Sequence, residues 1–335
     1  MVRLEHELRG ARPSMRYVGG DFTAWQTEAR AKLKEILGIP LERTEPDLRI
    51  EFDRDEEGFR EIRFLFASEP DVDVVCHLLL PHGADENNKV PLVICLQGHT
   101  TGMHISLGRA KYEKDKNDIA GGDRDFAIQV IRRGQAALTL EQRGFGERGG
   151  SESEFLCTQL GLASMLLGRP LVGQRCHDIS CAIDLLEEYF PQVDTGCIAL
   201  LGNSGGGTAT IYAAAVEERI SAAIPSCAVC GYTESIGLQR HCVCNYVPNI
   251  MKYFDMGDLG ALVAPRKLIV VNGQNDKIFP IGAANEQYEV TKAAYEAAGC
   301  PENVCHIVGA EGHRFYAADT WSVFDKMTEW KKLER

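Results

Sequence analysis

The stretch Cys197-Ile-Ala-Leu-Leu201-Gly202-Asn203-Ser204-Gly205-Gly206-Gly207 decides the fold. Its apolar first half is typical of a strand buried on both faces of a parallel sheet. The alanine-rich segment that follows, as far as Ala215, is typical of a helix. Glycine at positions 202 and 206 permits a turn too sharp for side chains on either side of Ser204. The stretch therefore predicts a buried strand, a tight turn and a helix.

Short apolar runs of the same kind recur on both sides of this stretch. They are Val90–Leu96, Gln135–Leu140, Ala222–Ala228, Lys267–Val271 and Val304–Val308. Helical spacing of apolar residues separates several of them, for example at 179–190 and 284–295. Alternating strands and helices predict an α/β fold with a mostly parallel central sheet flanked by helices.

The N-terminal part has a different pattern. Runs with partial alternation, typical of antiparallel strands with one solvated face, occur at Leu48–Phe52, Glu61–Ala67 and Val72–Leu80. Before them, Asp21 precedes apolar residues at helical spacing, and Gly38 ends that segment. Residues 1–20 are polar and rich in glycine, which indicates an arm lying over the body of the protein.

These patterns predict one main domain with an N-terminal extension. We expect residues 1–45 to form an arm and a helix that pack on the core, and residues 46–335 to form the α/β domain. Residues 231–258 show no strand pattern, so we expect them to lie over the functional site as a small cap.

Composition excludes several classes of protein. Of the 335 residues, 36 are Lys or Arg and 48 are Asp or Glu, so the net charge is −12. Such a field repels nucleic acid and anionic lipid surfaces, and we expect neither as a partner. No apolar run is long enough to span a membrane, and the N-terminus lacks the apolar stretch of a signal peptide. We therefore expect a cytoplasmic protein with reduced thiols.

Ser204 is the candidate nucleophile. A serine between glycines, at a turn from strand to helix, projects its hydroxyl from the edge of the sheet. The helix that follows also offers backbone N–H groups to a developing negative charge. The alternative is a glycine-rich turn that binds phosphate, but the Rossmann spacing and the lysine of a P-loop are both missing.

A serine hydroxyl needs a base, and the base needs an orienting acid. Asp276 follows the run that ends at 271, and His313 follows the last apolar run. The order Ser, Asp, His is the one used by this strand–turn–helix motif. Asp276 could instead cap a helix, Glu311 is a rival acid, and His99 is a rival base, but its place before the serine favours His313.

Loops after other strands supply candidates for the rest of the site. The backbone N–H groups of Gly205 and His99 are the candidate oxyanion hole, although the glycine turn before His99 could be an ordinary loop. Arg143 and Phe145 are candidates for the substrate rim. Arg143 could equally form a salt bridge that braces its loop.

A group of cysteines and one histidine needs a separate interpretation. It comprises Cys227, Cys230, His241, Cys242 and Cys244. Soft ligands of this kind can hold zinc, but C-x-C is an uncommon zinc spacing and one member lies in a strand-like run. We favour buried structural thiols over a metal site or a cysteine nucleophile. We expect no metal and no cofactor.

Residues 88–325, which contain these motifs, resemble the α/β-hydrolase superfamily, in particular its acetyl xylan esterase-like and dienelactone hydrolase-like branch. The resemblance rests on these stretches: 97–99 (Gln-Gly-His), 143–148 (Arg-Gly-Phe-Gly-Glu-Arg), 202–207, 241–248 (His-Cys-Val-Cys-Asn-Tyr-Val-Pro), 276–280 and 312–315. It implies an α/β-hydrolase fold, with Ser204 as nucleophile, His313 as base and Asp276 as its orienting acid. Carbohydrate deacetylases of this kind usually carry Arg-Gly-Gln, whereas this chain has Phe145, which suggests a more apolar rim.

The sequence therefore predicts a serine hydrolase of the carboxylesterase type that cleaves a small ester, with an acetylated sugar or another small metabolite as the candidate substrate. Two alternatives remain. One is hydrolysis of another bond, in a dienelactone, between carbons or in a peptide. The other is a non-catalytic binding protein on the same fold. The expected partner is a small-molecule ester, and a homodimer is plausible.

Overall fold

The computed structural model describes residues 2–149 and 156–333. The strands of this part of the chain form one sheet in the order β1-β2-β3-β5-β4-β6-β7-β8-β9. They are β1 (Arg49–Glu56), β2 (Phe59–Glu69), β3 (Val72–Pro81), β4 (Val90–Leu96), β5 (Ala136–Leu140), β6 (Val193–Asn203), β7 (Ile220–Ser226), β8 (Lys267–Gly273) and β9 (Val304–Gly309). The pairs from β1 to β3, and β3 with β5, are antiparallel. All pairs from β5 through β4 to β9 are parallel.

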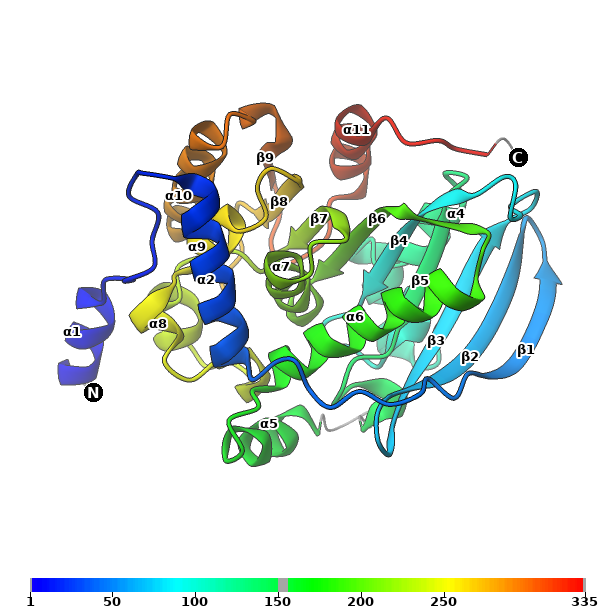
Figure 1. Ribbon diagram of the computed structural model, residues 1–335, viewed down its shortest axis with the longest axis horizontal. Coiled ribbons are helices and arrows are strands. Elements are labelled where there is room, and N and C mark those ends of the chain that lie inside the picture. Colours follow the sequence, from blue (N-terminus) through cyan, green and yellow to red (C-terminus); the bar gives the residue numbers. More distant parts are fainter. Residues whose placement is uncertain (1, 150–155, 334–335) are drawn as a thin grey trace.

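Helices cover both faces of this sheet (Figure 1). They are α1 (Val2–Gly10), α2 (Phe22–Leu37), α3 (Glu113–Lys116), α4 (Phe126–Ile131), α5 (Cys157–Met165), α6 (Leu171–Tyr189), α7 (Gly205–Val216), α8 (Ile250–Tyr253), α9 (Met256–Ala261), α10 (Ile281–Ala297) and α11 (Ala317–Thr328). One hydrophobic core contains α2, α6, α7, α9 and α10, and a second, on the other face, contains α4 and α11. The predicted α/β architecture is therefore confirmed.

The central strands appear in the sequence as continuous apolar runs because they are buried on both faces. Every residue of β4 and β5 is buried, and so are the last residues of β6. Side chains on both faces of such strands pack against helices, so the sequence has no alternation. In β1, by contrast, no residue is fully buried, because this strand is the edge of the sheet.

The first twenty residues contain a helix that the sequence pattern did not indicate. In α1 no residue is buried, so its sequence carries no apolar face of the usual width. The arm nevertheless contacts the region after β7. Ser14 and Met15 donate backbone hydrogen bonds to the carbonyls of Lys252 and Tyr253, both 3.0 Å long.

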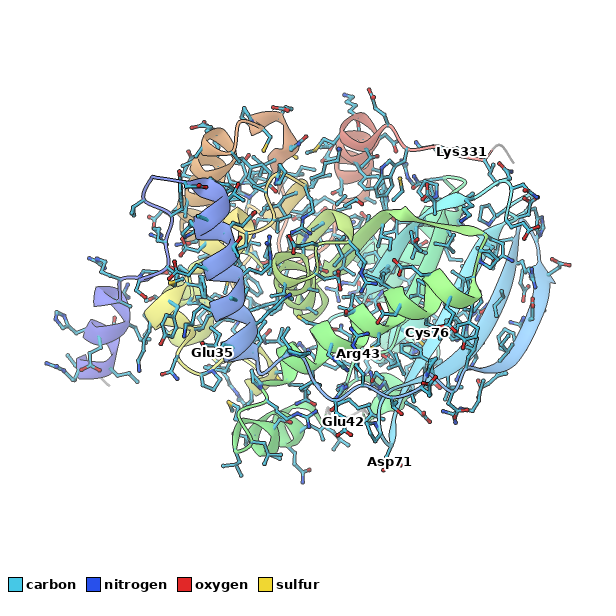
Figure 2. All side chains as sticks on the ribbon, viewed as in Figure 1. Glu35, Glu42, Arg43, Asp71, Cys76 and Lys331 are labelled. Atoms are coloured by element: carbon cyan, nitrogen blue, oxygen red, sulfur yellow. The ribbon has the colours of Figure 1, made fainter. Side chains whose placement is uncertain are left out.

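Helix α2 begins and ends at the residues that the sequence indicated. The Asp21 side chain accepts a hydrogen bond from the Ala24 N–H at 3.0 Å, and Gly38 ends the helix in the left-handed conformation at φ 66°. After α2 the chain runs along α6 toward β1, and Arg43 forms an ion pair with Asp184 of α6 (Figure 2).

Two arginines contact the carboxyl end of α7, the helix that follows Ser204. Arg30 of α2 is buried and donates to the carbonyl oxygens of Ala215 and Leu262, both at 3.0 Å. Arg266 donates to the Ala214 carbonyl at 2.7 Å. These side chains satisfy carbonyls that have no partner within the helix and place positive charge at its negative end.

Among the helices of the described residues, none combines the length and apolar character needed to cross a bilayer.

Candidate active site

Ser204 lies on the turn between β6 and α7 in a strained backbone conformation. Its φ is 57° and its ψ is −123°, a region that L-residues rarely adopt and that costs about 1–3 kcal/mol. A Cβ on Gly202 would lie 2.3 Å from the Gly206 carbonyl, and a Cβ on Gly206 would lie 2.2 Å from the Leu96 carbonyl oxygen. The two glycines are therefore required by close backbone contacts around the serine.

The loops after β8 and β9 bring His313 and Asp276 together. The His313 Nδ1 lies 2.7 Å from Asp276 Oδ2, and the Asp276 side chain is fully buried. Asp276 Oδ1 also accepts the backbone N–H groups of Ile278 at 2.8 Å and Phe279 at 3.1 Å. Burial raises the pKa of Asp276, but the hydrogen bond and charge of His313 and these backbone groups outweigh it, so the pKa lies below its usual value.

The ionised carboxylate sets the tautomer of the histidine. A carboxylate only accepts hydrogen bonds, so Nδ1 of His313 carries the proton and Nε2 is left with a lone pair. The ring of Phe279 stacks on the imidazole at 5.8 Å between centroids and 14° between planes. Glu311, the rival acid, forms an ion pair with Arg314 at 3.0 Å on the surface.

The two residues predicted to form the oxyanion hole lie on neighbouring backbones. A Cβ on Gly98 would lie 2.9 Å from the Ser204 Cβ and 3.2 Å from the Gly205 nitrogen. A Cβ on Gly205 would in turn lie 3.0 Å from His99 Nδ1. The loop after β4 therefore crosses directly over the first turn of α7, where backbone N–H groups and the helix dipole favour an anion.

A cavity of about 320 Å³ contains Ser204, Gly205, His99 and His313. The segment 231–258 supplies one wall with Gln239, Arg240, His241, Cys242 and Asn245, and the remaining wall residues are Arg124, Ile278 and Phe279. Burial, and then the charges of His99 and His313, lower the pKa of His241 to about 4, so this imidazole is neutral at pH 7.

Only the middle of the predicted cap lies at this cavity. The segment contains η4 (Thr233–Gly237), η5 (Val243–Asn245), α8 and the start of α9. Phe254 and Met256 belong to the main hydrophobic core, and Tyr232 is buried against Tyr212. The C-terminal part of 231–258 therefore belongs to the body of the protein.

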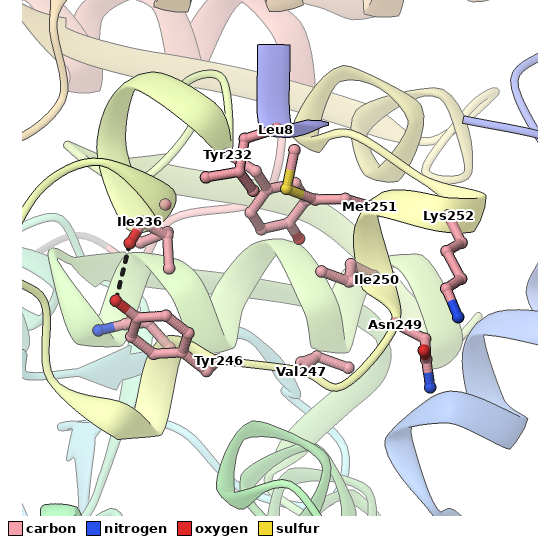
Figure 3. A pocket seen from close by; sticks show the side chains of 11 residues that line it. Leu8, Tyr232, Ile236, Tyr246, Val247, Asn249, Ile250, Met251 and Lys252 are labelled. Atoms are coloured by element: carbon pink, nitrogen blue, oxygen red, sulfur yellow. Dashed lines mark hydrogen bonds between the residues drawn. The ribbon is translucent and has the colours of Figure 1, made fainter. Parts of the chain in front are cut away.

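A second, apolar cavity of about 300 Å³ lies behind the cap wall (Figure 3). Leu8 of α1, Tyr232, Tyr246 and Met251 line it, and Asn245 lines both cavities. The N-terminal arm thus contributes to the support of the wall that faces Ser204.

Arg143 and Phe145 do not lie at the substrate rim, contrary to the sequence-based expectation. Neither lines the cavity that contains Ser204. Arg143 is buried and bonds Asp178 at 2.6 and 2.8 Å and Glu69 at 2.7 Å. It braces its loop, which is the alternative that the sequence left open.

Phe145 is 1% exposed, because its ring packs between two other side chains. The edge of the ring meets His99 at 4.8 Å between centroids, and the Arg175 guanidinium lies 4.3 Å from the ring centre. This phenylalanine therefore packs against His99 and stabilises its loop, and its side chain does not line the substrate cavity.

Arg124 is a residue of the site that the sequence did not predict. Arg124 lies in the loop before α4, forms an ion pair with Asp118 at 2.9 Å and donates to the His313 carbonyl at 3.4 Å. Burial is the largest influence on its guanidinium and lowers the pKa. No motif surrounds this residue, so the sequence offered no signal for it.

Comparisons with known proteins agree with this geometry. A model described as Abhydrolase family matches residues 6–160. A curated relative, "Putative hydrolase YtaP" of Bacillus subtilis (strain 168), is 26% identical over 212 residues, which are 61% of this chain and 69% of that protein.

Two solved structures share the fold over nearly the whole chain. One, described as a putative acetyl xylan esterase from Bacteroides fragilis NCTC 9343, has a TM-score of 0.77 at 17% identity and covers 98% of this chain and 89% of its own. The other, a glucuronoyl esterase from Solibacter usitatus, has a TM-score of 0.71 at 16% identity and covers 92% of this chain and 93% of its own. The strand order, the strand–Ser204–helix turn and these matches together show that the chain has the α/β-hydrolase fold.

Proposed function

We propose that this protein is a serine hydrolase of the carboxylesterase type that cleaves a small ester. The observation that carries the proposal is the 2.7 Å contact between His313 Nδ1 and Asp276 Oδ2, in the same cavity as the strained Ser204. The similarity to a protein described as an acetyl xylan esterase and to a glucuronoyl esterase supports an ester as the substrate.

The proposed reaction begins with proton transfer from the Ser204 hydroxyl to Nε2 of His313. The serine oxygen attacks the ester carbonyl, and the N–H groups of Gly205 and His99 stabilise the negative oxygen of the tetrahedral intermediate. His313 then gives its proton to the leaving alcohol, and the acyl group stays on Ser204. Water, deprotonated by the same histidine, attacks the acyl-enzyme and releases the acid and the free serine.

The cavity supports a substrate with a polar alcohol part. Its wall carries the side chains of Arg124, Gln239, Arg240 and Asn245. Its volume of about 320 Å³ lies at the lower end of the range for small-molecule sites. We therefore propose an acetylated sugar or a similar small acetylated metabolite. A cytoplasmic location is part of the proposal and is supported by the twelve cysteines, none of which forms a disulfide.

The decisive test compares the wild type with Ser204→Ala on p-nitrophenyl acetate and butyrate. We expect activity in the wild type, loss of about 10³-fold or more in the variant, and unchanged circular dichroism. A fluorophosphonate probe should label the wild type at Ser204 only. Equal activity in both proteins would contradict the serine mechanism. Activity confined to lactones or peptides would contradict the ester substrate and leave the nucleophile in place.

A further inference from the structure

A cluster of three thiols and one imidazole lies beside the catalytic cavity. It consists of His99 in the loop after β4, Cys157 at the start of α5, and Cys242 and Cys244 around η5. The Sγ atoms of Cys157 and Cys242 are 2.9 Å apart, and the Sγ of Cys244 lies 3.3 Å from His99 Nε2. All four possible ligand atoms lie within 4.8 Å of one another.

We propose that His99, Cys157, Cys242 and Cys244 bind one zinc ion in a structural site. Three cysteines and one histidine are an established ligand set for structural zinc, which takes four protein ligands in a tetrahedron. With Zn–S bonds of about 2.3 Å and a Zn–N bond of about 2.0 Å, tetrahedral ligands lie roughly 3.5–3.8 Å apart. The spacing of the four atoms is thus within about 1 Å of that geometry.

The surroundings of the cluster fit a structural site. Cys157 and Cys244 are buried in a small apolar group with Phe145 and Leu171. Phe145 also packs against the ring of His99, which fixes the direction of the imidazole. A dry shell and an oriented histidine are the features that strengthen metal binding around the first ligands.

The sequence alone favoured buried structural thiols and no metal, and the ligands it offered as the alternative were a different set. Of the five residues considered there, Cys242 and Cys244 belong to this cluster. Cys227 instead lies near Asp276 and His313, inside the catalytic group. Cys230 bonds the Pro280 carbonyl at 3.5 Å. The missing ligands, His99 and Cys157, lie far away in the chain and reach the site only through the fold.

A zinc ion here would join three segments that surround the nucleophile. It would connect the loop that carries the proposed oxyanion donor, the helix α5 and the exposed part of the cap. Because four protein ligands leave no open position, its role would be to position the His99 loop over Gly205 and not to act on the substrate. This inference concerns metal content and holds whether or not the proposed esterase activity is found.

A disulfide between Cys157 and Cys242 is the competing interpretation. Their sulfur separation of 2.9 Å exceeds the bond length of about 2.05 Å, and a disulfide would leave Cys244 and His99 without a role. Convergence of four donors, rather than two, favours the metal.

The test measures zinc in the full-length chain, purified without chelator and with reductant, by inductively coupled plasma mass spectrometry. We expect one zinc per chain in the wild type and loss of the metal in Cys244→Ser and in Cys157→Ser. The control is Cys230→Ser, a buried thiol outside the cluster, which should keep its zinc. Circular dichroism of each variant shows whether it has folded.

Cobalt provides a second measurement that needs no variant. Metal is removed from the wild type with a chelator and replaced by Co²⁺, and the absorption spectrum is recorded. Thiolate-to-cobalt charge-transfer bands and intense ligand-field bands of a tetrahedral site would support the proposal. Zinc-free protein with twelve titratable thiols would overturn it, as would zinc that persists in Cys157→Ser and Cys244→Ser. Zinc-free protein that has two fewer titratable thiols when it is purified without reductant would overturn it in favour of the disulfide.

Discussion

Replacement of Arg143 by alanine tests whether this residue braces the fold or binds substrate. Its guanidinium bonds the buried Asp178 at 2.6 and 2.8 Å, Gln174 at 2.8 Å and Glu69 at 2.7 Å. Removal of one partner from a buried ion pair costs about 3–5 kcal/mol. In Arg143→Ala, Arg148 would still contact Asp178 at 2.7 Å. We therefore expect a loss of stability at the lower end of this range, about 3 kcal/mol.

The expected loss corresponds to a measurable change in melting temperature. At about 2 °C per kcal/mol for a chain of this size, Arg143→Ala should melt about 6 °C below the wild type. The KM for p-nitrophenyl acetate should stay within about twofold, because Arg143 does not line the cavity that contains Ser204. Melting is followed by circular dichroism, and KM comes from initial rates at a temperature where both proteins are folded.

Arg240→Ala is the matched control. Arg240 is exposed and lines the catalytic cavity. Its removal should change stability by about 0.5 kcal/mol or less and should change KM or substrate preference instead. If Arg143→Ala has the melting temperature of the wild type and a raised KM, then Arg143 binds substrate, and its proposed role in stabilising the loop is wrong.

Three further predictions concern the site and its supports. Asp276→Asn should lower kcat by about 10⁴-fold with little change in melting, because an amide that donates to Nδ1 of His313 selects the wrong tautomer; activity within tenfold of wild type would contradict it. Burial raises the pKa of Glu141 to about 7, so this carboxyl's contribution to stability is complete below about pH 4.5 and is lost as the pH rises through 7. Relative to Glu141→Gln, the free energy of unfolding of the wild type, measured with urea, should fall by up to about 3 kcal/mol over that pH interval. Equal pH dependence of the free energy of unfolding in the two proteins would refute the raised pKa of Glu141. Gly206→Ala should destabilise the protein by several degrees or prevent folding, whereas Gly282→Ala, whose Cβ would meet no atom within 4 Å, should leave melting unchanged or slightly raised.

The sheet could be predicted from the sequence because its central strands are buried on both faces. Each predicted apolar run corresponds to a strand, and the antiparallel segments before residue 81 form the edge of the same sheet. The candidate residues Ser204, Asp276 and His313 could be proposed from the sequence for a related reason. Each follows the end of a parallel strand, and the ends of parallel strands meet at one edge of the sheet.

The residues between the strands were harder to place. Arg143 and Phe145 also follow a strand, but whether a loop side chain faces the cavity or the interior of the protein depends on the residues that it contacts. Those partners, Asp178 and Arg175, lie on α6, more than one element away in the sequence. Helix α1 was missed because it is short and mostly charged, and none of its residues is buried.

The buried contact of Arg30 limits how this chain can be divided or recombined. Arg30 bonds the carbonyl of Ala215 near the end of α7, which lies about 16 Å along the helix from the turn that carries Ser204. A shortened version that starts after α2 would lose one of the two arginines at the end of that helix and expose the apolar face that Leu33 and Leu37 cover. In a chimaera, a foreign N-terminal segment would have to bring both an arginine at this position and a matching apolar surface. Helix α2 is therefore unsuitable as a place to cut, tag internally or exchange, even though it lies outside the sheet.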